Sequence, residues 1–254
     1  MTQPARTLVR QAFDQAAERY DLAASIQRHA CHRLALGLPA ASAPSRLLDA
    51  GCGTGYGSQL LSQRFPAATV LALDLASAML QRVPPACLRV SADLEHLPLA
   101  AETLDLYWSS MAVQWCDLGR ALREARRVLR PGGHLAVSTL GPRTFHELRE
   151  AFAAVDQHQH TIMFTPVETV RSAAASAGFS AVHIENQAET TYHPNLRSLL
   201  RSVKSVGANQ LGAGRRRGLL SPRSWQKIEA AYETRRSPAG LPLTYDLIYL
   251  HASV

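Results

Sequence analysis

The sequence predicts an α/β protein with a doubly wound, mostly parallel sheet, and three observations support this. Short apolar runs alternate with helix-patterned segments from residue 46 to residue 140, which is typical of parallel strands joined by helical crossovers. The first apolar run stops in a glycine-rich turn, residues 51–55. The 254 residues, 46% of them hydrophobic and 19% charged, allow one large α/β domain or two small ones and exclude disordered and fibrous proteins.

The elements of this sheet follow one another from residue 46. Residues 46–50 form the first strand, and residues 56–65 show the apolar spacing of a helix that Pro66 closes. The later elements are expected as strand 69–73, helix 76–83, strands 87–91 and 104–109, helix 118–129, strand 134–140, helix 167–177, and strands 181–192 and 243–250. Helices between parallel strands cover both faces of the sheet.

Three segments do not fit this alternation. Residues 1–41 have helical apolar spacing and predict an N-terminal helical cap. Residues 42–254 then form the core. Two polar and basic insertions, at about 141–165 and 195–238, are expected to form a helical lid over a substrate.

Composition points to a cytoplasmic protein without a metal site. No stretch approaches the ~20 consecutive apolar residues of a membrane span, and the amino terminus lacks an apolar signal core. The four cysteines, Cys31, Cys52, Cys87 and Cys116, are scattered and lack the paired spacing of zinc or redox motifs. We expect buried thiols in a reducing compartment.

Positive charge is concentrated in one insertion. Residues 194–238 hold ten basic residues against two acidic ones, a net charge of +8, while the whole chain carries +7. The rest of the chain therefore nets −1. Such a segment suggests an acidic partner, which could be nucleic acid, an anionic membrane or an acidic protein. A solvated helical face is the alternative.

The first turn and the residues around it indicate an adenosine-type cofactor. Ligands of an open parallel sheet bind at the carboxyl ends of its strands, and glycines there let the backbone approach a ligand closely. Asp74 ends the second strand, where a carboxylate can accept hydrogen bonds from ribose hydroxyls. Asp49, just before the turn, would repel phosphates and suits a cationic group. These features favour S-adenosylmethionine over a dinucleotide.

The turn, Asp74, and the segments 93–94 and 130–133 resemble the class I S-adenosylmethionine-dependent methyltransferases. The resemblance implies a Rossmann-like sheet of about seven strands with the last one antiparallel, and adenine flanked by Asp93 and Leu94. The cofactor-binding residues it implies are Asp49, Gly51, Gly53, Gly55, Asp74, Leu75, Asp93, Leu94 and Ser109.

Further segments are similar to the malonyl-[acyl-carrier protein] O-methyltransferase family of biotin synthesis. They are residues 13–21, 110–116, 139–148, 155–160 and 203–209. Related carboxyl methyltransferases, such as those for trans-aconitate, share the stretch 112–115, and Ser110 stands where the family commonly has Asn. The resemblance implies methylation of the free carboxylate of a malonyl thioester.

This reaction needs no general base, because a malonyl carboxylate is already ionised at neutral pH. The sequence shows no nucleophile–base pair, so alignment and desolvation should supply the catalysis. Arg143 is the candidate to orient the carboxylate, with His158 and His160 as other donors, and Tyr20 is expected to close over the methyl group. We therefore take Tyr20, Arg143 and His160 as candidate catalytic residues. Each has an alternative interpretation without a catalytic role: Arg143 as a surface arginine, His158 and His160 as exposed loop histidines, and Tyr20 as a core aromatic.

The resemblance also implies a partner, an acidic acyl-carrier protein that carries malonyl-phosphopantetheine, and neither nucleic acid nor a membrane. The residues expected to meet its acidic helices or its phosphate are Arg201, Lys204, Arg215, Arg216 and Arg217. Malonyl-coenzyme A is a second possible substrate. A methyltransferase for another small carboxylate or a quinone precursor, a non-catalytic binding factor and a hydroxylase-type assembly factor remain alternatives.

Overall fold

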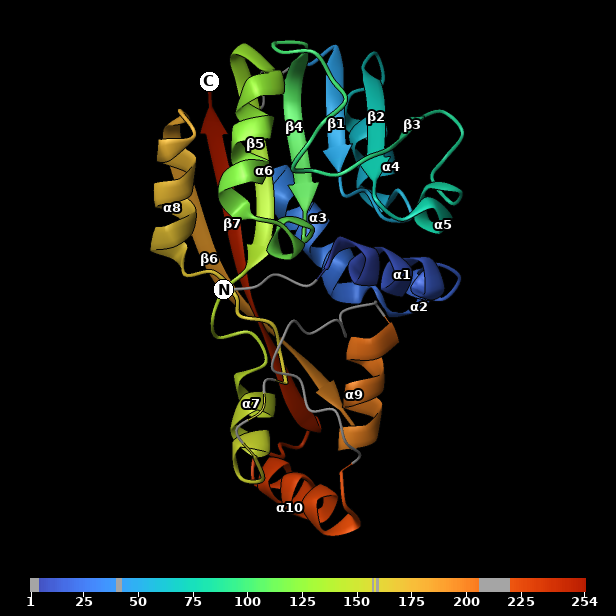
Figure 1. Cartoon of the computed structure of the whole chain (residues 1–254), viewed down its shortest axis with the longest axis vertical. Helices are drawn as coiled ribbons and strands as arrows, with labels where there is room; N and C mark the ends of the chain where they lie inside the picture. Colours follow the sequence, from blue (N-terminus) through green and yellow to red (C-terminus); the bar gives the residue numbers. More distant parts are fainter. Residues whose placement is uncertain (1–4, 40–42, 157, 159, 206–219) are drawn as a thin grey trace.

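One twisted sheet organises the computed structural model, which describes residues 5–39, 43–156, 158, 160–205 and 220–254. In these residues seven strands pair in the order β3-β2-β1-β4-β5-β7-β6 (Figure 1). The strands are β1 Arg46–Ala50, β2 Thr69–Asp74, β3 Leu88–Ser91, β4 Leu104–Ser110, β5 Leu129–Leu140, β6 Ser180–His193 and β7 Leu241–Ser253. β7 runs antiparallel to both of its neighbours, and the other pairs are parallel. The predicted doubly wound fold class is confirmed.

The helices precede, connect and extend these strands. They are α1 Arg6–Ala16, α2 Tyr20–Ala23, α3 Ser25–Leu36, α4 Tyr56–Arg64, α5 Ser77–Leu80, α6 Leu118–Val128, α7 His146–Ala153, α8 Val167–Ser176, α9 Leu196–Ser205 and α10 Pro222–Glu233, with a short 3₁₀ helix at Val113–Trp115. α5 is shorter than the predicted helix 76–83, because the chain leaves the helix in a turn at residues 81–82. No helix within the described ranges has the length and apolar content for a bilayer crossing.

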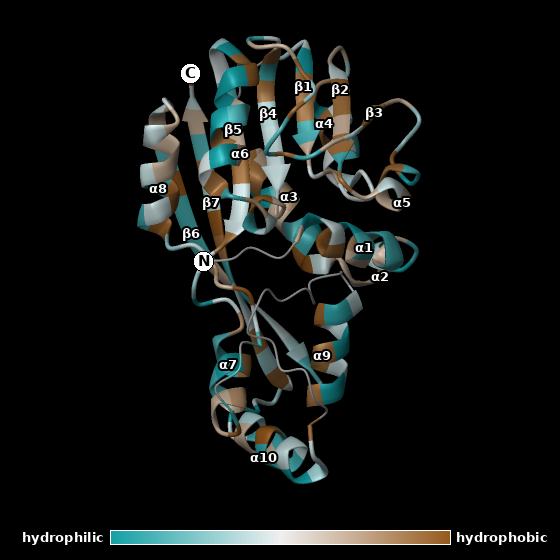
Figure 2. Cartoon of the chain, viewed as in Figure 1, coloured by the Kyte–Doolittle hydropathy of each residue, from teal (hydrophilic) through white to brown (hydrophobic). Residues whose placement is uncertain are grey.

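The two large clusters of the hydrophobic core lie on opposite faces of the sheet, and a third, small cluster contains Ala17, Ala76 and Met79. Leu47 belongs to the cluster that contains residues of α3 and α4, whereas its neighbour Leu48 belongs to the cluster with α6 and α8. Successive side chains of a strand point to opposite faces, so a fully apolar strand supplies both clusters. Figure 2 shows brown, hydrophobic residues along β2 and β7, and teal residues on the visible faces of α6 and α8.

The N-terminal helices pack against the core. α3 contacts α4, β4 and β5, and α1 contacts α5. α3 therefore covers part of one sheet face, while α1 and α2 lie across the carboxyl ends of the strands (Figure 1). The division of the chain into a cap (residues 1–41), a core and a lid stays a prediction.

β6 and β7 continue as a pair beyond the end of β5. The last partners of β5 and β7 are Leu140 and Leu247, but β6 and β7 stay paired until His193 meets Leu241. We call residues 188–193 and 241–246 the β6–β7 extension. α7, α9 and α10 pack on and around it and form the lower lobe in Figure 1.

Asp246 fixes the point where β5 stops and the lower lobe begins. Its carboxylate accepts hydrogen bonds from the Arg143 N–H at 3.0 Å and from the Asn186 amide at 2.9 Å. The Gly141 N–H donates to the Asp246 carbonyl at 2.7 Å. A Cβ atom on Gly141 would lie 2.5 Å from Oδ2 of Asp246, so only glycine allows this approach.

We expect Gly141→Ala to lower the free energy of unfolding by about 1–3 kcal/mol, because the added methyl group would push against a buried, hydrogen-bonded carboxylate. Urea denaturation measures this change. Gly119→Ala in α6 is the matched control: its Cβ would meet nothing closer than 3.4 Å, and helix propensity favours alanine by up to about 1 kcal/mol. Equal losses in the two variants would contradict the role given to Gly141.

Candidate functional site

Three adjoining hollows lie at the carboxyl ends of the parallel strands. The first, which we call the Asp74 hollow, has a volume of about 640 Å³. The residues at and after the ends of β1, β2, β3 and β4 supply much of its lining, and α1 and Tyr20, the first residue of α2, cover it. The lining residues from the strand ends are Gly51, Gly53, Asp74, Leu75, Ala76, Asp93, Leu94, Ser110, Met111 and Ala112.

The glycine turn brings backbone to the wall of this hollow. Gly51 has φ +75° and Gly53 has φ +54°, a region that L side chains rarely adopt. A Cβ on Gly51 would lie 2.3 Å from Cβ of Ala112, whereas a Cβ on Gly53 would face open space, with Cε1 of Tyr20 nearest at 3.9 Å. Gly51 thus permits tight packing, and Gly53 leaves its backbone open to a ligand.

Asp74 is held rigidly at the edge of the hollow. One carboxylate oxygen accepts the Gly53 N–H at 2.9 Å, and the other accepts the Ala76 N–H at 2.8 Å. Burial raises the pKa of Asp74 above its ordinary value, although these backbone hydrogen bonds oppose the shift. Each oxygen keeps a further acceptor site, so the side chain can receive two hydroxyl groups side by side.

Arg6 closes the opposite side of the Asp74 hollow, and the sequence analysis missed it. Its Nε lies 3.1 Å from Oδ2 of Asp93, and its guanidinium also pairs with Glu95 and donates to the Trp115 carbonyl. Oδ1 of Asp93 accepts the Glu95 N–H at 3.0 Å. These contacts join α1 to the loop after β3. These contacts link residues that are far apart in sequence, so the spacing of residues in the sequence does not predict them.

The second hollow, the Asp49 hollow, adjoins the first at Gly51, Gly53, Tyr20 and Ser110. Asp49 is buried and accepts the Ser58 hydroxyl at 2.7 Å. Burial raises the pKa of Asp49 to about 7.

Arg28 is the one arginine or lysine among the described residues that line the Asp49 hollow. It donates to the Asp21 carbonyl at 2.6 Å. A carboxylate and a guanidinium in one hollow suit a zwitterionic ligand.

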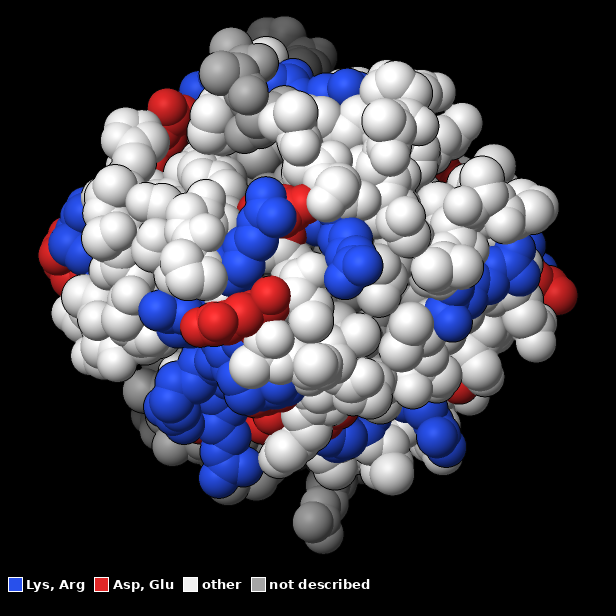
Figure 3. All heavy atoms as spheres, turned by 90° about the horizontal axis from the view of Figure 1, so that it is seen from above, with Lys and Arg blue, Asp and Glu red and all other residues white. Residues whose placement is uncertain are grey.

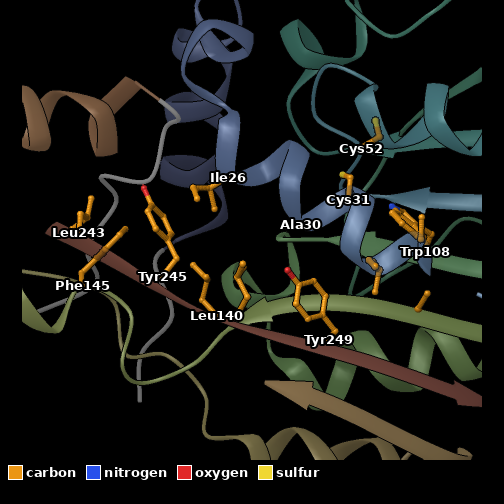
Figure 4. Close-up of a cluster of buried hydrophobic side chains, with 14 of the residues drawn as sticks. Ile26, Ala30, Cys31, Cys52, Trp108, Leu140, Phe145, Leu243, Tyr245 and Tyr249 are labelled. Carbon is orange, nitrogen blue, oxygen red and sulfur yellow. The ribbon is translucent and has the colours of Figure 1, made fainter. Parts of the chain in front are cut away.

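The third hollow, the aromatic hollow, has a volume of about 670 Å³ and an uncharged wall. Its described lining includes no Arg, Lys, Asp or Glu. The aromatic members are Phe13, Tyr20, Trp115, Phe145, Phe164 and Tyr245, and the polar ones are Gln27, Gln114, His160 and Thr161. Figure 4 shows Phe145 and Tyr245 near Leu140, where β5 ends.

Tyr20 lines all three hollows. Burial raises its pKa far above the ordinary value and raises the pKa of Tyr245 to about 12. Both phenols therefore stay protonated at neutral pH and can donate hydrogen bonds. Oε1 of Gln114 is buried without a partner among the described residues, while Nε2 donates to the Met111 carbonyl at 2.6 Å. That oxygen is available to a ligand donor.

The structure brings most of the predicted site residues to these hollows. The predicted residues that line them are Tyr20, Asp49, Gly51, Gly53, Asp74, Leu75, Asp93, Leu94 and His160. His160 pairs with Asp156 at 2.7 Å, and its ring centroid lies 4.0 Å from that of Phe152. His158 is exposed.

Three predicted residues do not line a hollow. Gly55, with φ +91°, packs where a Cβ would lie 2.8 Å from Pro84. Ser109 is fully buried and donates to the Ala50 carbonyl at 2.7 Å; its neighbour Ser110 lines the hollows instead, since successive strand residues face opposite ways. The Arg143 side chain is exposed and is not part of the aromatic hollow wall.

A groove with three basic residues lies between α1 and α9. Arg19, Arg201 and Lys204 line it, and its volume is about 940 Å³. We call it the basic groove. Val203, between two of its residues on α9, lines the aromatic hollow, so this helix separates the groove from the hollow. Arg215, Arg216 and Arg217 lie outside the described residues.

Charge is distributed differently at the other end of the molecule. Figure 3 shows the end that carries the amino ends of the parallel strands, where blue Lys and Arg adjoin red Asp and Glu. No cluster of three His, Cys, Asp or Glu side chains in the described ranges could hold a metal ion. The four cysteines are buried and form no disulfide.

Comparisons with known proteins agree with this geometry. A family model described as a methyltransferase domain matches residues 48–137. The malonyl-[acyl-carrier protein] O-methyltransferase of Dechloromonas aromatica is 58% identical over 251 residues, which cover 99% of this chain and 95% of that protein. The biotin biosynthesis bifunctional protein BioHC of Cellvibrio japonicus is 38% identical over 95% of this chain and 49% of its own length.

A solved structure has the same fold. Phosphoethanolamine N-methyltransferase 2 of Haemonchus contortus, in complex with phosphomonomethylethanolamine and S-adenosylhomocysteine, superposes with a TM-score of 0.61 at 15% sequence identity. The match covers 96% of this chain and 59% of that chain.

The raised pKa of Asp49 predicts a pH-dependent stability of the ligand-free protein. An unfolded aspartate titrates near pH 3.9, whereas Asp49 titrates at about 7 in the fold. Between these values the folded state holds a proton that the unfolded state has released, so stability falls as pH rises through this window. We expect the stability of Asp49→Asn to lack this fall with rising pH. Urea denaturation at pH 5, 6, 7 and 8 measures the difference, and parallel stability curves for the two proteins would contradict it.

Proposed function

Because the chain belongs to the malonyl-[acyl-carrier protein] O-methyltransferase family, we propose that it transfers a methyl group from S-adenosylmethionine to the free carboxylate of malonyl-acyl-carrier protein. The product is the malonyl methyl ester, an early intermediate of biotin (pimeloyl) synthesis. The observation that supports this most directly is an uncharged aromatic hollow that meets two charged hollows at Tyr20. A cytoplasmic location is part of the proposal, since the four buried cysteines form no disulfide.

The two charged hollows fit the parts of the cofactor. Asp74 would hold the ribose hydroxyls, and Asp93 with Leu94 would flank the adenine. Asp49 would face the ammonium group and Arg28 the carboxylate of the methionine part. The open face of Gly53 leaves room for this chain of groups. When bound, the cofactor supplies an electrophilic methyl group on a sulfonium centre.

The aromatic hollow would receive the malonyl carboxylate among neutral donors. Tyr20 and Tyr245 offer protonated hydroxyls, and Gln27 offers an amide. The negative charge of the carboxylate disappears as the ester forms, so a guanidinium would stabilise the starting state more than the transition state. Weak neutral donors orient the oxygen without this penalty. The exposed Arg143 side chain therefore plays no part in the proposed site.

Water exclusion is the second contribution of this hollow. Phe13, Trp115, Phe145 and Phe164 present ring surfaces that leave few hydrogen-bonding groups for solvent. A desolvated carboxylate is a stronger nucleophile than a hydrated one. Since both tyrosines keep their protons, neither serves as a base, which agrees with an acceptor that needs none.

The basic groove gives the carrier a place to dock. Arg201 and Lys204 are exposed on α9, and Arg19, the residue before α2, lines the same groove. None of the three has an ion-pair partner among the described residues. An acidic carrier would meet unpaired cations there, beside the helix that also lines the aromatic hollow.

A radiolabelled methyl-transfer assay tests the proposed function. We expect label from S-adenosylmethionine to appear as an ester on malonyl-acyl-carrier protein, and to a smaller extent on malonyl-coenzyme A, but not on trans-aconitate. Asp74→Ala is the matched control, because the loss of charge-assisted hydrogen bonds should weaken cofactor binding at least about tenfold in calorimetry. Label on trans-aconitate but not on the malonyl carriers would overturn the proposal.

Charge reversal in the basic groove tests carrier docking. We expect Arg201→Glu with Lys204→Glu to raise the KM for malonyl-acyl-carrier protein at least about tenfold, because both would then repel the acidic carrier. Malonyl-coenzyme A should be affected less. The matched control reverses the same charge on α10, with Arg223→Glu and Lys227→Glu, which are exposed outside the groove. An unchanged ratio of the two efficiencies would show that the groove is a solvated face.

A further inference from the structure

Phe145 has a backbone conformation that bulky residues avoid. Its φ is +57° and its ψ is +30°, at the residue before α7. The left-handed region brings Cβ too close to the following carbonyl oxygen, so glycine or asparagine usually occupies it. Such strain persists only where the surroundings over-determine it, and it concentrates at functional sites.

Hydrogen bonds from β7 hold Phe145 and the residues before it in place. The Phe145 N–H donates to the Thr244 carbonyl at 2.7 Å. The Thr144 hydroxyl accepts the Asp246 N–H at 3.0 Å, and the Asp246 carboxylate accepts the Arg143 N–H. The β6–β7 extension therefore imposes the turn on residues 143–145. A glycine would satisfy the same turn without strain, so the phenyl ring is the part that needs an explanation.

The ring of Phe145 lines the aromatic hollow and neither of the two hollows proposed for the cofactor. It meets the Tyr245 ring edge-on, with centroids 4.9 Å apart, and the Phe164 ring with centroids 6.2 Å apart. Figure 4 shows the Phe145 and Tyr245 rings next to each other. None of these three residues lines the Asp74 or Asp49 hollow, unlike Phe13 and Tyr20. They form the part of the wall that the cofactor would not reach.

We propose that Phe145, held in its strained conformation by the β6–β7 extension, is the residue that limits the acyl chain to malonyl length. The inference rests on the proposed function. Both ends of the substrate are fixed, since the carboxylate must reach the methyl group and the thioester must lead out to the carrier. The extra methylene groups of a longer dicarboxyl chain have to bulge sideways. The Phe145 ring, braced by Tyr245 and Phe164, fills that space.

The mechanism of selection is steric. A hydrophobic pocket discriminates against an additional methylene group by roughly 10–200-fold when it is too small to hold it. Flexible side chains yield to such a group, but the Phe145 ring is fixed by its backbone and by two edge-on aromatic contacts. Asp246 acts as the positioning residue, because it holds the turn without lining the hollow.

Calorimetry with two thioesters tests the proposal. Malonyl- and glutaryl-pantetheine would be titrated into the full chain saturated with S-adenosylhomocysteine, which cannot donate a methyl group, so the readout is binding. The wild type should prefer malonyl. In Phe145→Gly, which relaxes the backbone and removes the ring, this preference should fall at least about tenfold. Phe145→Leu keeps a core side chain and should show a smaller fall, which preserves the test if the glycine variant does not fold.

Ile228→Ala is the control for a merely structural role. Ile228 is fully buried in α10 and belongs to the same core cluster, but it does not line the hollow. This variant should lose thermal stability and keep the wild-type preference. An unchanged preference in both Phe145 variants overturns the role of Phe145 alone. A wild type that binds glutaryl as well as malonyl overturns the malonyl substrate and this role together.

Discussion

The arrangement of the site depends on β7 pairing over its whole length with β6 but over only part of its length with β5. Residues 247–253 complete the sheet beside β5, whereas residues 241–246 pair with β6 alone among the strands that the structure describes. A two-stranded ribbon is marginal alone in water, so α7, α9 and α10 must cover the β6–β7 extension. These elements lie beyond the carboxyl ends of the parallel strands (Figure 1). The aromatic hollow is the space between this lobe and the carboxyl ends of the parallel strands.

Charge changes in a consistent order along the path from cofactor to carrier. The two hollows proposed for the cofactor contain the buried carboxylates Asp49 and Asp74, whose pKa values burial raises. The aromatic hollow is uncharged, and the basic groove lies on the far side of α9. In the proposed function, a cationic cofactor, an anion whose charge is consumed and an acidic protein would each meet the environment that favours them.

Local sequence patterns predicted the sheet and several residues that line the Asp74 and Asp49 hollows, because strand ends, tight turns and carboxylates at fixed offsets are short-range features. Prediction was less successful where contacts between residues far apart in sequence decide the position of a side chain. Arg143 looked well placed after β5, but Asp246, some hundred residues later, binds its N–H, and the side chain is exposed. Ser109 and Ser110 differ only in which face of β4 they occupy, a choice that the apolar pattern leaves open. Arg6 reaches Trp115 across 109 residues.

The features that lower the stability of the folded protein lie together at the hollows. Asp49 and Asp74 have no cationic partner among the described residues, and Phe145 keeps a backbone strain that glycine would avoid. Buried charges and strained backbone each cost on the order of 1–3 kcal/mol, a large share of a typical stability of about 5–15 kcal/mol. Apart from Phe145, which belongs to one of them, the two large core clusters on the sheet faces carry no such features and supply the stability. A cationic ligand would compensate the carboxylates directly, so binding and stability are coupled at this site. The residues that weaken the empty protein are therefore the ones that prepare it for its ligands.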